Sequence, residues 1–204
     1  LSMPELNNQN FNHLKIHTQY SICEGAIKID NLKDFCKEKK IPCLGISDTS
    51  NLCGALEFAE NISKVGTQPI IGTQIYFRFE DTTGLLPLIA LNENGYKRII
   101  ELSSRSYLEN DALSDPHLDV KDLLIDTEGV SLLSGTIQGL FGKLFEKGRL
   151  DEISKLYRSL SSKFNDNFYL EIQRHGDQNE IAFEKFNLEQ SLKIQIPIIA
   201  TNEV

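Results

Sequence analysis

The chain is predicted to fold as one α/β domain, and the order of its segments favours a barrel of parallel strands. Apolar runs of strand length alternate with longer stretches of helical periodicity. This alternation is typical of parallel strands joined by helices, either in a barrel or in an open doubly wound sheet. The chain has no G-x-G-x-x-G after its first strand and no G-x-x-x-x-G-K-[ST]. The absence of these nucleotide-binding motifs favours the barrel.

Seven segments have the length and apolar content of strands. They are Phe11–His17, Cys43–Ser47, Pro69–Phe79, Leu86–Asn92, Gly129–Gly135, Asn167–Gln173 and Ile196–Thr201. Between the third and fourth lies Glu80-Asp81-Thr82-Thr83-Gly84, a turn-forming sequence with no helical stretch. We therefore expect a hairpin at this point and helical connections elsewhere.

Seven segments between the strands have helical periodicity. They are Ile29–Lys39, Leu52–Val65, Gly95–Tyr107, Val120–Leu124, Gln138–Lys147, Arg149–Phe164 and Asn179–Leu192. Asp30 and Asn51 are residue types that cap helix N-termini, so we expect them to cap the first two helices. Gly66 is expected to end the second helix.

Composition indicates an ordinary globular protein. The 204 residues carry a net charge of −8, with 40% hydrophobic and 25% charged residues. An acidic surface repels phosphate backbones, which argues against a stand-alone, non-specific nucleic-acid binder. No apolar run approaches the roughly 20 residues of a membrane-spanning helix, and Leu1-Ser2-Met3-Pro4-Glu5 lacks the layout of a signal peptide. We expect a cytoplasmic protein with no membrane partner.

Four cysteines, Cys23, Cys36, Cys43 and Cys53, lie close together in the sequence without a C-x-x-C pair. Reduced, mostly buried thiols explain this spacing in an intracellular protein, and they are favoured over a cysteine zinc site.

The run from His13 to Thr18 has the pattern of an altered metal site. On an extended strand, alternate side chains share one face, so His13, Lys15 and His17 would point together. Two imidazoles on one face suit a divalent metal such as zinc. The ammonium of Lys15 offers no lone pair and adds a positive charge.

Polar residues also gather at the ends of the predicted strands. Six of them lie at or just after the C-terminal end of a predicted strand, and a seventh, Gln74, falls inside a long one. The six are His17, Asp48, Asn92, Thr136, His175 and Glu203. In a parallel barrel the carboxyl ends of the strands converge on one mouth, where binding sites form. The alternative is that each strand simply runs into a polar loop.

Several of these segments together resemble a known family. The motifs, in chain order, are Phe11–Ser21 with Glu24-Gly25-Ala26, Gly45–Gly54, Pro69–Gly72, Gly95-Tyr96 with Ser103–Tyr107, Leu132–Gly135, Tyr169–Gly176 and Ile199–Glu203. In this order and spacing they are similar to the PHP (polymerase and histidinol phosphatase) domain, and more closely to the PHP domains at the N-terminus of bacterial replicative DNA polymerase III alpha subunits. The similarity spans roughly residues 11 to 203. It predicts a tail at 1–10 and a PHP domain at 11–204 that is truncated at its C-terminal end.

The resemblance implies a distorted (β/α)7 TIM-like barrel, whose mouth in intact family members holds up to three metals for phosphoester hydrolysis. His17, Asp48 and His175 match ligand positions, and Glu203 stands where an aspartate is usual. At other ligand positions of the pattern the metal-binding side chain is replaced. Lys15 and Thr49 stand where histidines are expected, Gln74 where a bridging glutamate is expected, Thr136 where a cysteine or histidine is expected, and Leu86 near the place of a further histidine. His13 matches a position outside the ligand set. The final aspartate–x–histidine motif lies beyond the end of the chain.

These substitutions disfavour a catalytic metal cluster. Two neighbouring dications need bridging carboxylates to offset their repulsion. One unit charge at about 4 Å, with an effective dielectric constant near 20, changes the local energy by about 4 kcal/mol. Gln74 removes a negative charge and Lys15 adds a positive one. We therefore expect no cofactor, or at most one zinc or manganese ion on His17, Asp48 and His175, and we expect Lys15 to pair with Asp48 or Glu203 instead.

The resemblance and its altered ligand positions leave three candidate functions. The resemblance favours an inactive module that stabilises the rest of the polymerase alpha subunit and docks the separate proofreading 3′–5′ exonuclease. DNA would then be contacted only through the full-length polymerase, because the family's catalytic aspartates lie in the palm region outside this chain. The second function is an active metal-dependent phosphoesterase or proofreading nuclease. The third is a free-standing enzyme like histidinol phosphatase.

Overall fold

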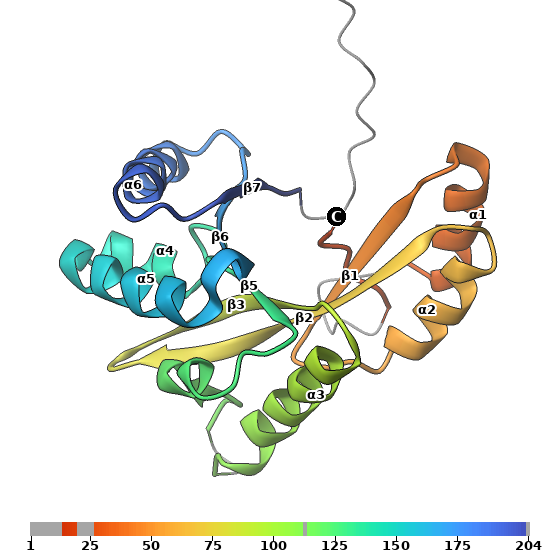
Figure 1. Cartoon of the computed structure of the whole chain (residues 1–204), viewed down its shortest axis with the longest axis horizontal. Coiled ribbons are helices and arrows are strands. Elements are labelled where there is room, and N and C mark those ends of the chain that lie inside the picture. The colour runs from red at the N-terminus through yellow and green to blue at the C-terminus, as the bar shows by residue number, and fades with distance from the viewer. Residues whose placement is uncertain (1–13, 20–26, 112–113, 203–204) are drawn as a thin grey trace, which may run out of the picture.

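The computed structural model describes residues 14–19, 27–111 and 114–202, which form a mixed α/β fold around one strongly curled sheet (Figure 1). The strands are β1 (Cys43–Thr49), β2 (Gln68–Phe79), β3 (Thr82–Ala90), β4 (Leu118–Asp119), β5 (Val130–Leu133), β6 (Phe168–Ile172) and β7 (Ile198–Ala200). Their order in the sheet is β1-β2-β3-β5-β6-β7, and the short β4 pairs with the far end of β2.

Helices pack around this sheet in three groups. The α-helices are α1 (Ile29–Lys39), α2 (Ala55–Ser63), α3 (Glu93–Leu108), α4 (Leu140–Glu146), α5 (Leu150–Phe164) and α6 (Gln178–Ile194), and the two 3₁₀ helices are η1 (Val120–Leu124) and η2 (Asn165–Asn167). In Figure 1, α1 and α2 lie beside β1 and β2, α4 to α6 lie at the opposite end, and α3 lies below the sheet. No helix in the described ranges is both long and apolar enough to cross a membrane.

The hairpin predicted from the turn sequence is confirmed. Strands β2 and β3 pair antiparallel from Gly72 with Ile89 to Phe79 with Thr82. The predicted turn was too long, because only Glu80 and Asp81 lie outside the two strands and Glu80 adopts a left-handed φ of 52°. β3 is also antiparallel to β5, whereas the β1–β2, β5–β6 and β6–β7 pairs are parallel.

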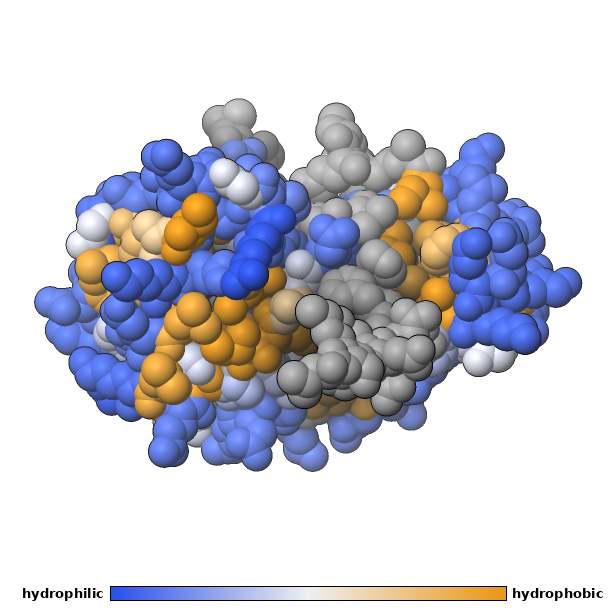
Figure 2. Space-filling view, turned by 90° about the horizontal axis from the view of Figure 1, so that it is seen from above, coloured by the Kyte–Doolittle hydropathy of each residue, from blue (hydrophilic) through white to orange (hydrophobic). Residues whose placement is uncertain are grey.

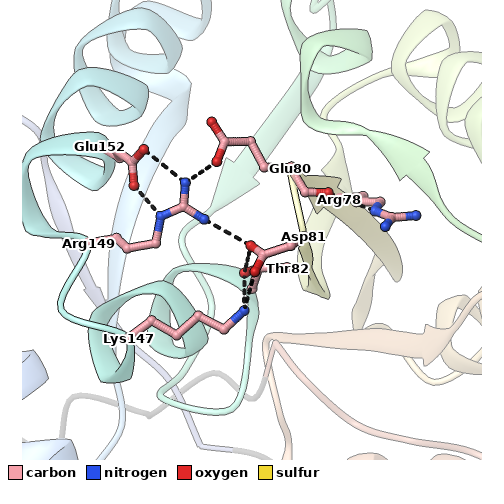
Figure 3. Close-up of polar contacts among 7 residues, drawn as sticks. All are labelled: Arg78, Glu80, Asp81, Thr82, Lys147, Arg149 and Glu152. Carbon is pink, nitrogen blue, oxygen red and sulfur yellow. Dashed lines mark hydrogen bonds and ion pairs between the residues drawn. The ribbon is translucent and has the colours of Figure 1, made fainter.

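The tip of this hairpin is held by charged side chains from the junction of α4 and α5 (Figure 3). The guanidinium of Arg149 binds Glu80, Glu152 and, at 3.0 Å, Oδ1 of Asp81. Nζ of Lys147 donates to Oγ1 of Thr82 over 2.7 Å. The carboxylates of both turn residues, Glu80 and Asp81, are therefore neutralised by side chains from a different part of the chain.

The curl of the sheet makes it a half-barrel. The segment before α1 joins the β1 edge through a parallel bridge between Ile16 and Ile46, and its predicted strand is reduced to isolated bridges in the described part. Residues 11–13 of that predicted strand lie outside the described residues. Pairing in the described ranges runs from this segment to β7 without closing a ring.

Two apolar cores fill the space between the sheet and the helices. The larger core lies under α3 to α6 and includes Phe77, Phe141 and Tyr157, whose side chains are fully buried. The smaller core, with Phe58 and Ile62, joins β1 to α1 and α2. Each such side chain contributes about 1.5–3 kcal/mol through burial.

The expected helix caps were partly wrong. Lys28 is the N-cap of α1, and Asp30 lies inside the first turn, where its charge complements the helix dipole. Asn51 accepts a hydrogen bond from the backbone of Cys53 (3.1 Å), a local turn that precedes the N-cap of α2 at Gly54. Gly66 is confirmed as a stop signal, because it follows α2 with a φ of 82° that favours glycine.

Candidate functional site in the barrel interior

The interior of the half-barrel is divided into an apolar hollow and a polar layer. Side chains alternate along β2, so Ile75 and Phe77 point into the larger apolar core under the helices, and Gln74 points to the inner face of the sheet. At the end of the sheet where β2 begins, inner side chains surround a hollow of about 370 Å³, lined mainly by Leu14, Ile70, Ile89, Leu133, Tyr169 and Ile199. Gln74 and the buried polar residues described below lie outside the lining of this hollow.

A buried ion pair lies in the polar layer. Nζ of Lys15 is 3.1 Å from Oε1 of Glu171, and their side chains are only 3% and 0% exposed. Glu171 comes from β6, and its carboxylate also accepts a hydrogen bond from the hydroxyl of Thr201. Oε2 of Glu171 is buried without a hydrogen-bond partner among the described residues.

Lys15 was predicted to pair with Asp48 or Glu203. Among the described residues the structure pairs it with Glu171 and not with Asp48, and Glu203 lies outside the described residues. Sequence reasoning missed Glu171 as a site residue. The available signal was an acidic side chain inside a predicted buried strand, because such a charge requires a partner.

His17 contacts Gln74, the residue that was expected to stand in place of a bridging glutamate. Nε2 of Gln74 lies 3.4 Å from Nε2 of His17, and both residues are buried. The contact suits an amide N–H that donates to the imidazole lone pair, with the ring proton on Nδ1. Nε2 of His17, one of the two ring nitrogens that could bind a metal, therefore faces the side-chain amide of Gln74.

Asp48 fastens the first segment to β1. Its Oδ1 accepts from the backbone N–H of Thr18 (2.7 Å) and its Oδ2 accepts from the Thr18 hydroxyl (2.6 Å). The side chain is buried, so both bonds form away from water. At this expected ligand position the carboxylate has a clear structural role.

His175 lies at the mouth, in a separate cavity of about 320 Å³ that Thr136, Gln138, Gln173, Asp177 and Glu180 also line. The imidazole is 56% exposed, and its Nδ1 lies 3.1 Å from Oε1 of Glu180. Thr136 and His175 are thus brought together as predicted. A chain of hydrogen bonds from Gln173 through Thr201 to Glu171 connects this cavity with the Lys15 ion pair.

Glu180 organises the loop that carries His175. Its Oε2 accepts from the backbone N–H of His175 (2.7 Å) and of Gly176 (3.1 Å). Burial acts to raise the pKa of Glu180, but these bonds and the His175 side chain outweigh burial and hold its pKa below the usual value. With Asp177 as N-cap of α6, Glu180 occupies the acidic position of a capping box, a sequence signal that could have predicted this role.

Asn92 was expected at the same mouth, and this was wrong. Its side chain accepts from the backbone of Gly95 (2.9 Å) and caps α3. The cause is the antiparallel direction of β3, whose C-terminal end lies with the apolar hollow at the opposite rim.

Metal-binding side chains do not form a cluster in the described ranges. Across residues 14–19, 27–111 and 114–202, no group of three or more histidine, cysteine, aspartate or glutamate residues could hold a metal ion. His13 and Glu203 lie outside these ranges. Cys36, Cys43 and Cys53 are free thiols, and burial raises the pKa of Cys36 and Cys43, whereas Cys23 is not among the described residues.

Comparison with known proteins agrees with the motifs. The PHP domain family model matches residues 13–175. DNA polymerase III subunit alpha of Caulobacter vibrioides is 36% identical over 99% of this chain, and that of Vibrio cholerae is 32% identical over 95%. The chain spans about 18% and 17% of the length of these two curated relatives and matches their N-terminal region.

Solved structures show the same fold at low sequence identity. An amidohydrolase from Chromobacterium violaceum, solved with bound sulfate and no metal, has a TM-score of 0.59 and 12% identity over 94% of this chain and 86% of its own. A protein described as a metal-dependent phosphoesterase from Bifidobacterium adolescentis has a TM-score of 0.52 and 12% identity over 93% and 86%. At this identity the similarity concerns the fold alone.

Proposed function

Because the chain belongs to the PHP domain family, we propose that it forms the N-terminal domain of a replicative DNA polymerase III alpha subunit. In this proposal the domain stabilises the polymerase and docks a separate proofreading 3′–5′ exonuclease, and it does not hydrolyse phosphoesters. The observation that carries the proposal is the buried ion pair between Lys15 and Glu171.

The ion pair bears on catalysis because it places a positive charge in the polar layer. Lys15 and His17 are alternate residues of one extended segment, so both side chains project toward the interior. An unpaired ammonium repels a cation about 4 Å away by about 4 kcal/mol at an effective dielectric constant near 20, and pairing with Glu171 reduces this repulsion while it occupies the carboxylate. The carboxylate of Glu171 already neutralises Lys15, and that of Asp48 is bonded to Thr18. The charges thus support a structural interior that works without a metal.

Metal content and chelation test this part of the proposal. We expect the purified, untagged protein to hold less than about a tenth of an equivalent of zinc or manganese, and a chelator to leave its melting temperature unchanged. A full equivalent of metal, or a melting temperature that falls with the chelator, would contradict the proposal. It would favour one ion on His17, Asp48 and His175, with Glu203 as a further ligand.

Activity is tested with a 3′-labelled primer and a generic phosphodiester in the presence of manganese or zinc. The matched control is His17→Ala, which removes the imidazole from the interior. We expect equal, background hydrolysis by both proteins. Turnover that disappears in His17→Ala would establish the alternative function, a metal-dependent phosphoesterase or proofreading nuclease.

The proposed partners follow from the relatives. These are named DNA polymerase III subunit alpha, and the chain corresponds to a small part of them. The remainder of the alpha subunit is therefore the first proposed partner, DNA is contacted only through the full-length polymerase, and the setting is the cytoplasm. Binding of the exonuclease subunit is tested by pull-down at micromolar concentration; a negative result would remove the docking role and leave the family assignment intact.

A further inference from the structure

The inner face of α6, which packs on the domain, is largely polar. The buried residues of this helix are Glu180, Phe183, Asn187 and Gln190. Asn187 is fully buried and accepts a hydrogen bond from the hydroxyl of Tyr157 over 2.8 Å, but its Nδ2 has no hydrogen-bond partner among the described residues. A buried amide without an acceptor has lost its hydrogen bonds to water and gained none in return. The packing of α6 is therefore weakened from inside.

The neighbouring helix α5 has the opposite composition. Its buried residues are Ile153, Tyr157, Leu160 and Phe164, all of them apolar or aromatic. On α6, Ile181 and Leu192 are 62% and 85% exposed in the described part of the domain. Figure 2 shows apolar side chains at the surface, among polar ones, on the half that carries α4 to α6. Packing stability comes chiefly from apolar area removed from water, so α6 is held less firmly than α5.

The loop before α6 is fastened to the helix itself. Glu180 accepts hydrogen bonds from the backbone N–H groups of His175 (2.7 Å) and Gly176 (3.1 Å). At the other end of the helix, the C-cap Gln195 has a left-handed φ of 64°. Hinges lie at such terminal positions, where a few dihedral angles absorb the movement of a rigid element. Residues 175–194, called the α6 flap below, therefore form one unit.

The α6 flap forms one wall of the cavity of about 320 Å³ at the mouth. His175, Asp177 and Glu180 line this cavity from the flap, and Thr136 and Gln173 line it from segments that follow β5 and β6. Gln173 is only 6% exposed. Because the flap is a wall of the cavity, its movement changes how far solvent and ligands reach Gln173.

We propose that the α6 flap opens as a unit while the rest of the domain stays folded, and that its opening controls access to the mouth cavity. Opening costs less for α6 than for α5, because the side chains of Asn187 and Gln190 regain water as a hydrogen-bond partner. The inference concerns the domain itself and does not depend on the proposed function.

Hydrogen exchange followed by mass spectrometry tests the opening, with α5 as the matched control helix. In the unchanged protein, backbone amides of α6 should exchange at least about tenfold faster than those of α5, after correction for intrinsic rates. The double variant Tyr157→Phe with Asn187→Leu replaces the buried polar pair by apolar side chains. It should narrow the gap between the two helices at least about threefold.

Maleimide labelling of Gln173→Cys, followed at its own peptide, tests access to the cavity. Labelling should proceed through flap opening, so adding the double variant should slow it by the same factor as exchange in α6. Labelling that the double variant leaves unchanged would overturn control of access, because the probe would then pass a closed flap.

Equal exchange in α5 and α6 would overturn the opening of the flap. A gap that the double variant fails to narrow would also overturn the inference, since the polar inner face would not be its cause. The comparison of the two helices is made in the unchanged protein, so it does not require any variant to fold.

Discussion

Nζ of Lys15 and Oε1 of Glu171 lie 3.1 Å apart, although the two residues belong to opposite ends of the sheet order. Lys15 sits in the segment bridged to β1, and Glu171 sits in β6, with β1, β2, β3 and β5 between them. A flat sheet could not bring these side chains into contact. The ion pair therefore fixes the curl of the sheet from the inside, in the layer where the family pattern places metal ligands.

Removal of one charge from this pair is expected to destabilise the domain strongly. Lys15→Ala leaves the carboxylate of Glu171 buried and without its cation, which costs about 3–5 kcal/mol in comparable buried pairs. Urea unfolding at neutral pH measures the loss. The double variant Lys15→Met with Glu171→Leu removes both charges and should recover most of the stability. A change below about 1 kcal/mol for Lys15→Ala would show that the pair does not hold the interior together.

Local patterns were sufficient to predict most elements of this fold. Helix α1 coincides with the predicted range Ile29–Lys39, because its apolar residues recur at helical spacing. The β2–β3 hairpin was likewise readable from its turn residues. The contact of Lys15 with Glu171 could not be predicted in this way, since Glu171 is 156 positions away and the contact depends on how far the sheet curls. The predicted position of Asn92 at the mouth was wrong for a related reason, because the direction of β3 in the sheet decides at which rim Asn92 lies.

Glu180 is expected to make stability depend on pH. Its pKa is lower in the folded protein than its ordinary value of 4.5, so the folded state favours the charged form. The contribution is fully present above that ordinary value and is lost as the pH falls through the folded pKa. At pH 7, Glu180→Gln should cost about 1–2 kcal/mol, because two backbone N–H groups and His175 lose a charged acceptor. Unfolding curves at several pH values should show the difference between the two proteins shrinking below pH 4.5. A difference that stays constant to pH 3 would assign the effect to packing.

Arg149 is expected to stabilise the hairpin in a way that depends on its guanidinium. It contacts Glu80, Asp81 and Glu152 at once, and its carbon Cζ lies 5.2 Å from the centre of the Phe79 ring. Lysine cannot form this planar, multidentate arrangement, so Arg149→Lys should lower the melting temperature almost as much as Arg149→Ala. High salt should reduce the difference between wild type and both variants, because the carboxylates are largely exposed. Full retention of stability in Arg149→Lys would show that charge alone suffices.

Gly95 is expected to tolerate no side chain, although it lies inside α3. A Cβ at this position would lie 1.7 Å from the carbonyl oxygen of Gly129, far inside van der Waals contact. That oxygen also accepts the backbone N–H of Leu91 (2.8 Å), and Gly129 itself has a φ of 74°, so the loop cannot easily retreat. Gly95→Ala should therefore cost about 2 kcal/mol or more, despite the higher helix propensity of alanine. Ser104→Ala is the matched control, because Ser104 is exposed on the same helix and should gain slightly in helix propensity. Thermal unfolding of both variants decides the matter: equal melting temperatures would show that α3 and the loop before β5 can separate without loss.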